Sequence, residues 1–411
     1  MNAPLLTAMV STYASERYLR GCLDDLLAQT LGDRLEIVVV DAASPEREGE
    51  LVRAYQHRHR NLRYVRCAQR ESTSAAFDRA TAMARGRYLT NANADDRHHP
   101  EFAERMVAVL EQCPQFGIAY ADSGINTVDN ETWHDTTAAQ RFAWPHYTPA
   151  TALSCCLFGP HPVWRANVHA TVGGWSEQFR IANDQDLFLR IARAHGAVHV
   201  DEVLGLFLQR PDSNAGSSKR AEVLAEGCAV MRRYRTAWPI DAVVPGALDG
   251  GPEAAAAAWF ELGNLAALSP YTDAELALQC YQRALALPLA GDVAHAARGA
   301  FANNSACVLA CAGSLPAAQR ALALVPTGAL REHNALRLAA AGSGVLPRLQ
   351  ELRFAELAHP VVDQSRRSRG VTVDRGGRVQ WTTERRQLPW DVFVGPNGVP
   401  WRRAVEPAAA G

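Results

Sequence analysis

The first half of the chain alternates short apolar runs with stretches whose apolar residues recur at helical spacing. The apolar runs, each closed by small or polar residues, span residues 5–10, 36–40, 62–65 and 88–90. The helical stretches between them span residues 15–27, 46–57 and 74–84. A continuous β-branched run such as 37–40 is typical of a parallel strand buried on both faces. Strands and helices in strict alternation predict a doubly wound α/β sheet.

Acidic and amide side chains follow two of these predicted strands. Asp41 ends the second strand, and Asn93, Asp95 and Asp96 follow the fourth. Because ligands in open α/β sheets bind beyond the carboxyl ends of the strands, the pattern places these residues at a ligand site. Hard divalent cations prefer carboxylate oxygens, so Asp95 and Asp96 are candidate metal ligands. The alternative is a solvated acidic turn with no ligand.

A second acidic cluster, at residues 183–190, opens a predicted helix. Asp184 and Asp186 precede apolar residues that continue at helical spacing. Acidic side chains in a first turn interact favourably with the helix dipole, which explains them without any catalytic role. The alternative is that Asp184 is a general base held at a helix N-terminus.

The second half of the chain has a different composition. A polar stretch at 213–218 predicts a boundary, after which the sequence is rich in Ala and Leu and is predicted to be helical. The large and small residues over 259–288 and 304–326 resemble two degenerate tetratricopeptide repeats, in which small residues let paired helices nest. A plain Ala-rich helical bundle is the alternative. Such repeats would present a concave surface to a protein partner.

Residues 370–382 carry two short β-type segments around a glycine turn, which predicts a β-hairpin in the C-terminal tail. We therefore expect three parts: an α/β domain at 1–217, a helical repeat domain at 218–345 and a tail at 346–411.

Charge and hydropathy exclude several classes of function. The net charge is −1, and the basic residues are dispersed, so we expect no nucleic-acid partner. No apolar stretch reaches the ~20 residues that span a bilayer, and the N-terminus lacks the pattern of a secretory signal. These features predict a cytoplasmic protein without a transmembrane segment and leave open peripheral contact with the inner membrane face.

Taken together, the segments of the first 217 residues resemble the family 2 glycosyltransferases of GT-A fold. The matching features, in chain order, are the Ser11-Thr12-Tyr13 turn, Asp41, the segment 84–88 leading into 93–96, the Gly174-Trp175 pair and the segment 183–190. Each piece alone is common. Their order and spacing together carry the resemblance.

The resemblance implies an inverting transfer of a sugar from a nucleotide-diphosphate donor, preferably a UDP-sugar, to a hydroxyl acceptor. The acceptor would be a glycan, a lipid-linked glycan or a protein, as in the synthesis of cell-surface polysaccharides. It also implies that Asp184 is the general base and that Asp95 binds Mn²⁺ or Mg²⁺ on the diphosphate. The implied nucleotide contacts are Thr12, Tyr13, Asp41, Asn93, Asp96 and Arg210. The implied acceptor contacts are Gly174, Trp175 and Asp186.

The sequence departs from the family pattern at several positions. Asn93 and Asn183 replace acidic residues, and Arg210 stands where many relatives have a histidine. An arginine cannot ligate a cation, but its guanidinium can pair with a diphosphate at two points. These departures motivate an alternative in which the domain is catalytically weakened and the protein is a scaffold acting through its helical repeats. A nicotinamide-dependent enzyme would need a glycine-rich turn, and residues 11–16 contain no glycine.

Overall fold

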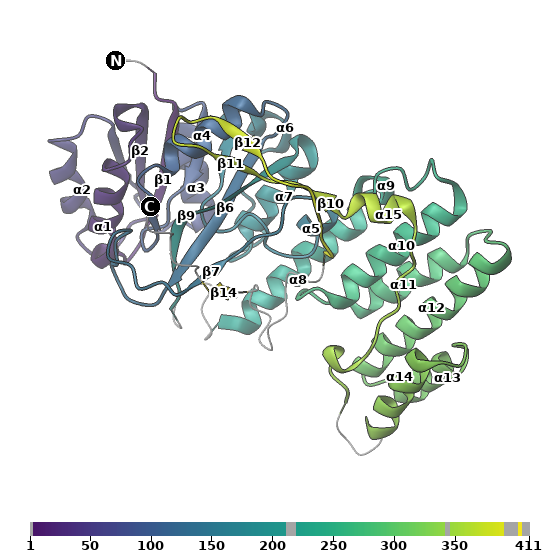
Figure 1. The fold of residues 1–411 in the computed structure, drawn as a ribbon. Coiled ribbons are helices and arrows are strands. Elements are labelled where there is room, and N and C mark those ends of the chain that lie inside the picture. The colour runs from purple at the N-terminus through teal and green to yellow at the C-terminus, as the bar shows by residue number, and fades with distance from the viewer. Residues whose placement is uncertain (1–2, 211–218, 342–345, 390–401, 405–411) are drawn as a thin grey trace.

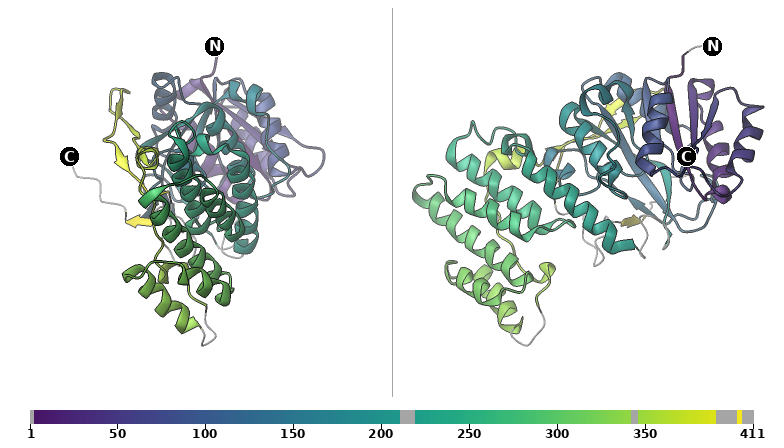
Figure 2. Two further views of the ribbon diagram at one scale, coloured as in Figure 1. Left: turned by 90° about the vertical axis from the view of Figure 1, so that its right-hand side faces the viewer. Right: turned by 180° about the vertical axis from the view of Figure 1, so that it is seen from behind.

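The computed structural model describes residues 3–210, 219–341, 346–389 and 402–404. An α/β part built around one large sheet is followed by a helical part, and the tail runs back from the helices to the sheet (Figures 1 and 2). The strands of the first part are β1 Leu6–Thr12, β2 Leu35–Asp41, β3 Leu62–Arg66, β4 Tyr88–Asn91, β5 Arg97–His98, β6 Ile118–Asn126, β7 Gln140–Phe142, β8 Val163–Arg165 and β9 Ala197–Leu208. Its helices are α1 Glu16–Leu27, α2 Glu48–Gln56, α3 Thr73–Met83, α4 Phe102–Gln112, α5 Pro149–Ala152, α6 His169–Val172 and α7 Asn183–His195.

The first four strands confirm the predicted alternation of strands and helices. They lie in the order β3-β2-β1-β4, and all their pairings are parallel. The sheet then continues through β8, β6 and β9. Because β8 runs antiparallel to both β4 and β6, the α/β sheet is mixed. This strand has only three residues and no alternating pattern by which the sequence could reveal its direction.

Helices cover both faces of the sheet. Alternate residues of each strand point to opposite faces, and apolar strand residues are buried on both faces. Ala8 and Ile37 belong to an apolar cluster with α1, α2 and α4 on one face. Met9 and Val38 belong to the cluster with α3 and α7 on the other face. All seven residues of β2 are buried, as its β-branched run predicts.

The second part consists of consecutive helices that pack side by side. These helices are α8 Arg220–Ala237, α9 Ile240–Val243, α10 Gly251–Leu268, α11 Ala274–Leu285, α12 Gly291–Cys311, α13 Leu315–Ala323 and α14 Ala329–Ala341. Each of α10 to α14 contacts the next, and the alternate helices α10, α12 and α14 also contact one another in sequence. Gly263 on α10 leaves room for the ring of Tyr281 on α11, where a side chain would clash. Paired helices are therefore present, and their identity as tetratricopeptide repeats stays a prediction.

The tail extends the sheet. It contains α15 Pro360–Ser365, β10 Arg367–Ser368, β11 Val371–Val373, β12 Val379–Trp381, β13 Arg385–Arg386 and β14 Arg402–Ala404. The predicted hairpin is present, since β11 pairs antiparallel with β12, and β11 also pairs with β9 at the sheet edge. Residues 370–381 thus complete the sheet of the first part, while the division of the chain into three domains stays a prediction.

Buried polar contacts join α8 to the α/β part. Tyr234 donates a hydrogen bond to Asp186 Oδ1 on α7 (2.7 Å). Arg235, which is 2% exposed, donates to the carbonyl oxygen of Leu153 (3.0 Å) in the α/β part and to Ser269 Oγ (2.5 Å) at the end of α10. In the parts of the chain that the structure describes, no helix is long and apolar enough to cross a membrane.

Candidate active site

The loops after β1 and β2 are tied together by a buried carboxylate at the carboxyl edge of the sheet. Ala14 and Ala43 adopt positive φ angles of 51° and 62°, which residues other than glycine rarely do, so both loops turn sharply. Glu48 Oε1 accepts hydrogen bonds from the backbone N–H of Ser15 (3.0 Å) and from Ser44 Oγ (2.7 Å). Our sequence analysis missed Glu48 because an acidic residue at the start of a helix is explained by the dipole alone.

Asp41 lies at the end of β2, as predicted, and is fully buried. Its Oδ1 accepts from the backbone N–H of Ser44 (2.7 Å), and its Oδ2 accepts from Tyr64 Oη (2.7 Å) and Arg66 Nη1 (2.5 Å). Both carboxylate oxygens therefore have donors within the protein. The role of Asp41 in contacting a nucleobase stays a prediction.

The turn after β1 presents an exposed aromatic ring. Tyr13 is 36% exposed, and the guanidinium of Arg70 lies 4.2 Å from the centre of its ring. Thr12, by contrast, is 1% exposed, and its hydroxyl lies 3.4 Å from Glu48 Oε1. Tyr13 and Arg70 are thus placed where a planar base could stack, whereas Thr12 packs beneath the turn.

The loop after β4 and the end of β9 form what we call the strand-end cluster: Asn93, Asp95, Asp96 and Arg210. Asp95 Oδ2 lies 3.0 Å from Arg210 Nη2, whose guanidinium lies 4.8 Å from the ring centre of Tyr18. Asp96 accepts hydrogen bonds from Asn93 Nδ2 (2.8 Å) and from the backbone N–H of Leu208 (3.1 Å). The structure thus brings together the residues that the sequence separates by more than one hundred positions.

The two carboxylates of this cluster differ in exposure and charge. Asp96 is 2% exposed, whereas the Asp95 side chain is 25% exposed. Burial, and then the neighbouring charge of Asp95, raise the pKa of Asp96 to about 8. A cation placed beside these carboxylates would relieve their repulsion.

This donor set fits a divalent cation of the kind that binds together with a phosphate ligand. Mg²⁺ is commonly held by one or two carboxylates, with substrate phosphates and water completing its shell. Asp95 can supply one carboxylate at the surface of the loop. Within residues 3–210, 219–341, 346–389 and 402–404, no group of three or more His, Cys, Asp and Glu side chains is arranged to hold a metal by itself.

Asp184 lies in the first turn of α7, and only a single glycine, Gly196, separates the end of this helix from β9. The helix runs back along the sheet, so its first turn lies toward the carboxyl edge. Asp184 is partly exposed, and its Oδ1 accepts from the backbone N–H of Gln185 (2.7 Å). Burial nevertheless raises the pKa of Asp184 to about 6, which is suitable for a general base near neutral pH.

Asn183 has a structural reason to be neutral. Its Nδ2 donates to Ser74 Oγ (2.8 Å), and Ser74 Oγ donates in turn to the carbonyl oxygen of Ser176 (2.9 Å). An ionised glutamate could not donate the first of these bonds. The amide therefore links the first turn of α7 to α3, and Ser74 extends this link to the segment before α7.

The side chains predicted to bind the acceptor are engaged in packing and ion pairs. Trp175 is 5% exposed and stacks on Phe77 with ring centres 4.7 Å apart. A side chain at Gly174 would clash with Asp78. Asp186 is 1% exposed and pairs with Arg190 through Oδ2 (2.9 Å). The acceptor contacts of Gly174, Trp175 and Asp186 remain predictions that these contacts do not favour.

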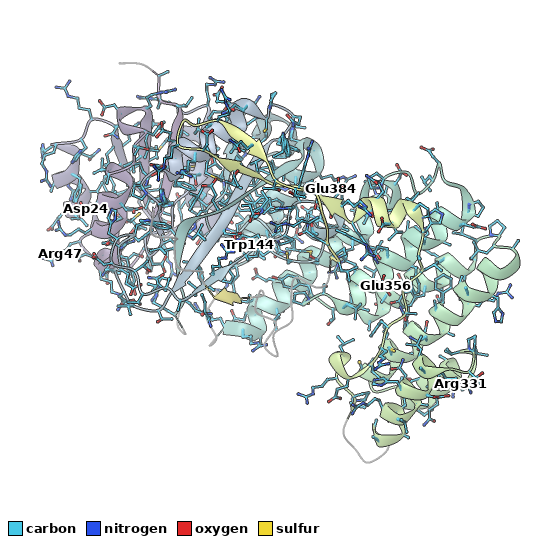
Figure 3. All side chains as sticks on the ribbon, in the orientation of Figure 1. Asp24, Arg47, Trp144, Arg331, Glu356 and Glu384 are labelled. Atoms are coloured by element: carbon cyan, nitrogen blue, oxygen red, sulfur yellow. The ribbon has the colours of Figure 1, made fainter. Side chains whose placement is uncertain are left out.

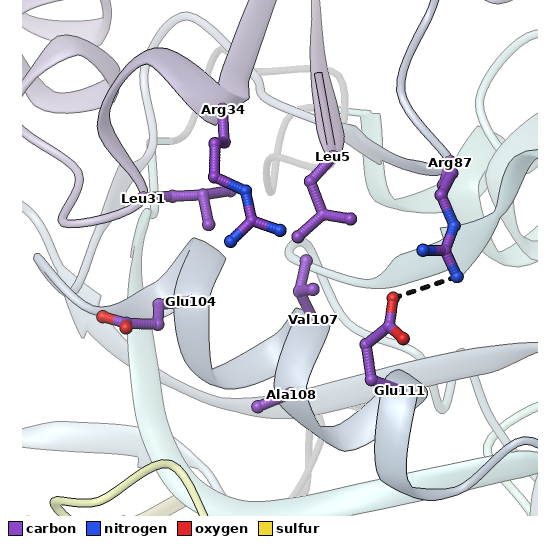
Figure 4. Close-up of a pocket in the computed structure, with 8 residues that line it drawn as sticks. All are labelled: Leu5, Leu31, Arg34, Arg87, Glu104, Val107, Ala108 and Glu111. Atoms are coloured by element: carbon purple, nitrogen blue, oxygen red, sulfur yellow. Dashed lines mark ion pairs between the residues drawn. The ribbon is translucent and has the colours of Figure 1, made fainter. Parts of the chain in front are cut away.

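Figure 4 shows a hollow at the opposite edge of the sheet. Leu5 and Arg87, two of its lining residues, come immediately before β1 and β4, and Arg87 pairs with Glu111 (3.2 Å). Because ligands of open α/β sheets bind at the carboxyl ends of strands, this hollow is not part of the candidate site.

Comparison with known proteins relates part of the chain to the glycosyltransferases. Residues 7–161 match the family described as Glycosyl transferase family 2. The chain is 27% identical over 222 residues to the O-antigen biosynthesis protein RfbC of Myxococcus xanthus, covering 53% of this chain and 17% of that protein. It is 32% identical over 109 residues to the uncharacterized glycosyltransferase EpsJ of Bacillus subtilis (strain 168), covering 26% and 31%. It is 20% identical over 200 residues to chondroitin synthase of Escherichia coli, covering 49% and 28%.

These matches relate the chain to glycosyltransferases, and residues 7–161 carry the similarity to family 2. The chain spans less than a third of the length of the three relatives named above. Among solved structures, Staphylococcus aureus TarS 1–349 aligns over 82% of this chain and 91% of that chain, with 14% identity and a TM-score of 0.45.

Proposed function

We propose that the chain transfers a sugar, with inversion, from a nucleotide-diphosphate donor to a hydroxyl group of a glycan, a lipid-linked glycan or a protein. A UDP-sugar is the preferred donor. The observation that carries this proposal is the strand-end cluster, which gathers two carboxylates and an arginine at the carboxyl edge of the sheet. The name of the Myxococcus relative supports a role in making cell-surface polysaccharides.

The donor would lie along the carboxyl edge of β1, β2 and β4. The exposed Tyr13 ring, with Arg70 beside it, would stack on the base, and the planar guanidinium of Arg210 suits the oxygens of a diphosphate. Asp95 would hold Mn²⁺ or Mg²⁺, which when bound neutralises the charge of the diphosphate leaving group. Asn93 keeps Asp96 oriented through the amide hydrogen bond of 2.8 Å.

The acceptor would be activated by Asp184. As an ionised carboxylate, Asp184 removes the proton from the acceptor hydroxyl, whose oxygen then bonds to the anomeric carbon of the sugar. The bond from that carbon to the diphosphate oxygen breaks on the opposite face, so the configuration inverts and the nucleotide leaves with its electron pair. Because the pKa of Asp184 is about 6, most of this carboxylate is ionised at neutral pH.

The second candidate is a scaffold whose glycosyltransferase domain is catalytically weakened. The ion pair between Asp95 and Arg210 favours it, because the arginine occupies the carboxylate that a cation would need. Under both candidates, the helical part would bind a protein partner, since stacked helix pairs present a continuous surface.

Release of free nucleotide from UDP-, GDP-, dTDP- and CDP-sugars separates the two candidates. We expect turnover of one donor class, and we expect Asp184→Asn to reduce it about 10²- to 10⁴-fold because the general base is lost. Glu253→Gln is the matched control, since Glu253 is an exposed acid in the first turn of α10, and it should leave turnover unchanged. Full activity of Asp184→Asn would refute the base assignment, and no turnover of any donor by the unmodified chain would favour the scaffold.

A further inference from the structure

Four buried asparagines line one side of the helical part. They are Asn264 on α10, Asn303 and Asn304 on α12, and Asn334 on α14, and none is more than 1% exposed. They are also the only asparagines between residues 219 and 389 of the sequence. Asparagine is a weak helix former and is seldom fully buried, so its repetition on alternate helices requires polar partners. We call these four residues the asparagine face.

The partner of the asparagine face is the main chain of residues 352–357, which we call the strap. The backbone N–H of Arg353 donates to Asn334 Oδ1 (2.9 Å). The carbonyl oxygen of Arg353 accepts from Asn334 Nδ2 (2.8 Å) and from Asn303 Nδ2 (2.9 Å). One amide side chain thus binds both polar groups of one strap residue, as a neighbouring β-strand would.

The same arrangement recurs two residues further along the strap. The backbone N–H of Ala355 donates to Asn304 Oδ1 (2.7 Å), and its carbonyl oxygen accepts from Asn304 Nδ2 (3.0 Å). A spacing of two is the repeat of extended chain, in which alternate residues present their polar groups to the same side. The asparagine face therefore forms hydrogen bonds with an extended main chain at every second residue.

The side chains of the strap add packing at two positions and one ion pair. Arg353 and Glu356 are exposed, and Glu356, which lies over the helical part (Figure 3), pairs with Arg366 (3.0 Å). Leu352, at 7% exposed, and the partly buried Phe354 pack on the apolar clusters of the helices. Recognition thus combines two apolar positions, spaced by two, with contacts that any peptide bond can make.

The asparagine amides are held in place by one another. Asn304 Nδ2 donates to Asn264 Oδ1 (2.7 Å), and Tyr281 Oη donates to the same oxygen (2.9 Å). Asn334 Nδ2 donates to Asn303 Oδ1 (2.9 Å). Such a connected network fixes the orientation of each amide before a peptide binds, which favours association.

We propose that the asparagine face is a peptide-binding groove in which the strap is an intramolecular occupant, and that an extended segment of a second protein takes the place of the strap. An empty groove would leave buried amides without partners, at about 1–3 kcal/mol for each group. Exchange of one extended chain for another keeps every main-chain hydrogen bond. Under the proposed function, this second protein would be the acceptor of the sugar. The binding groove itself does not depend on the proposed function.

Binding of a fluorescent peptide to the full chain tests the groove. The first peptide carries the sequence of residues 351–358, and the second keeps Leu352 and Phe354 but replaces the residues between and after them. A linked strap competes at an effective concentration in the millimolar range, so the unmodified chain should bind either peptide weakly. Leu352→Ser with Phe354→Ser loosens the strap, and this chain should bind both peptides at least tenfold more tightly.

Further variants of the loosened chain identify the contacts. Adding Asn304→Ala and Asn334→Ala should weaken peptide binding at least tenfold, while adding Gln279→Ala, an exposed amide on α11, should not. A folded loosened chain that binds neither peptide would overturn the proposal, as would binding that ignores the asparagine substitutions. Binding of the first peptide alone would also overturn it, because the groove would then be specific to its own strap.

Hydrogen exchange of the unmodified chain covers the case in which the loosened chain does not fold. Excess peptide should accelerate exchange at the amides of Arg353 and Ala355 and leave the amides of Ile37 and Val39 in β2 unchanged. Exchange of the strap that stays constant under saturating peptide would contradict the proposal. Donor turnover of the same samples reports separately on the proposed function, since no part of the strand-end cluster is altered.

Discussion

The strand-end cluster is partly buried and the asparagine face is fully buried, and the two groups of polar side chains differ in charge and in how their hydrogen-bonding groups are used. In the strand-end cluster, Asp96 lies beside the like-charged Asp95, and this repulsion helps to raise its pKa. On the asparagine face, neutral amides bond to one another and to the strap. A site with like charges close together becomes more stable when a ligand binds. A neutral site whose hydrogen bonds are all made can only exchange one bound chain for another.

The largest effect that would sharpen this comparison is the removal of divalent cations. A chelator should lower donor turnover about 100-fold or more, because the cation no longer neutralises the charge of the leaving group. Adding Mn²⁺ back should restore the rate of the unmodified chain and leave the rate of Asp95→Asn low. Full turnover in chelator would show that the ion pair of Asp95 and Arg210 replaces the cation.

The next effect is on the stability of the neutral cluster. Asn304→Ala removes the acceptor of the Ala355 N–H, the nearer of two donors to the Ala355 carbonyl oxygen and one donor to Asn264. We expect a loss of about 2–4 kcal/mol in the free energy of unfolding, measured by urea denaturation. Gln279→Ala should change it by less than about 0.5 kcal/mol, because this amide is exposed. Equal losses in the two variants would show that the asparagine face is not specifically stabilising.

The pH dependence of turnover tests the role of Asp184. If the ionised carboxylate is the base, kcat should rise about tenfold per pH unit below pH 6 and level off above it, since the pKa of Asp184 is about 6. The residual turnover of Asp184→Asn should lack this rise. A rise that persists in the variant would assign the titration to another group.

The smallest effect is a gain in stability on removing the same charge. The pKa of Asp184 is raised in the folded chain from 3.8 to about 6, so its contribution is fully present below pH 3.8 and is lost as pH rises through 6. Asp184→Asn should therefore stabilise the chain at pH 8 by about 1–3 kcal/mol relative to its effect at pH 3.5. A variant that is destabilised more at pH 8 than at pH 3.5 would contradict this sign.

Local patterns in the sequence predict the parts of the fold that local interactions determine. The order of β1 to β4 and their helices follows from apolar periodicity, and the positions of Asp41 and Asn93–Asp96 follow from where those strands end. The direction of β8 and the return of the tail to the sheet have no such local signal. The tail depends on contacts such as that between Val371 and Val200, which are 171 residues apart.

The same distinction holds for the sites. Asp184 and the strand-end cluster were predicted because their spacing matches a family pattern. The asparagine face was not, because Asn264, Asn304 and Asn334 lie on three helices, and each of them alone fits a helical repeat. Their shared partner is a strap that lies between 19 and 91 residues away in sequence. Asparagine restricted to buried helix positions is the signal that could have revealed it.

The central claim, a nucleotide-sugar site at the carboxyl edge of the sheet, is tested most directly by thermal-shift titration. UDP, GDP, dTDP and CDP would each be added to the unmodified chain and to Asp95→Asn, with and without Mn²⁺. Since a bound ligand stabilises the folded state by mass action, we predict a Tm increase with one nucleotide, UDP by preference, that requires Mn²⁺ and is absent in Asp95→Asn. No increase with any nucleotide under either condition would contradict the account.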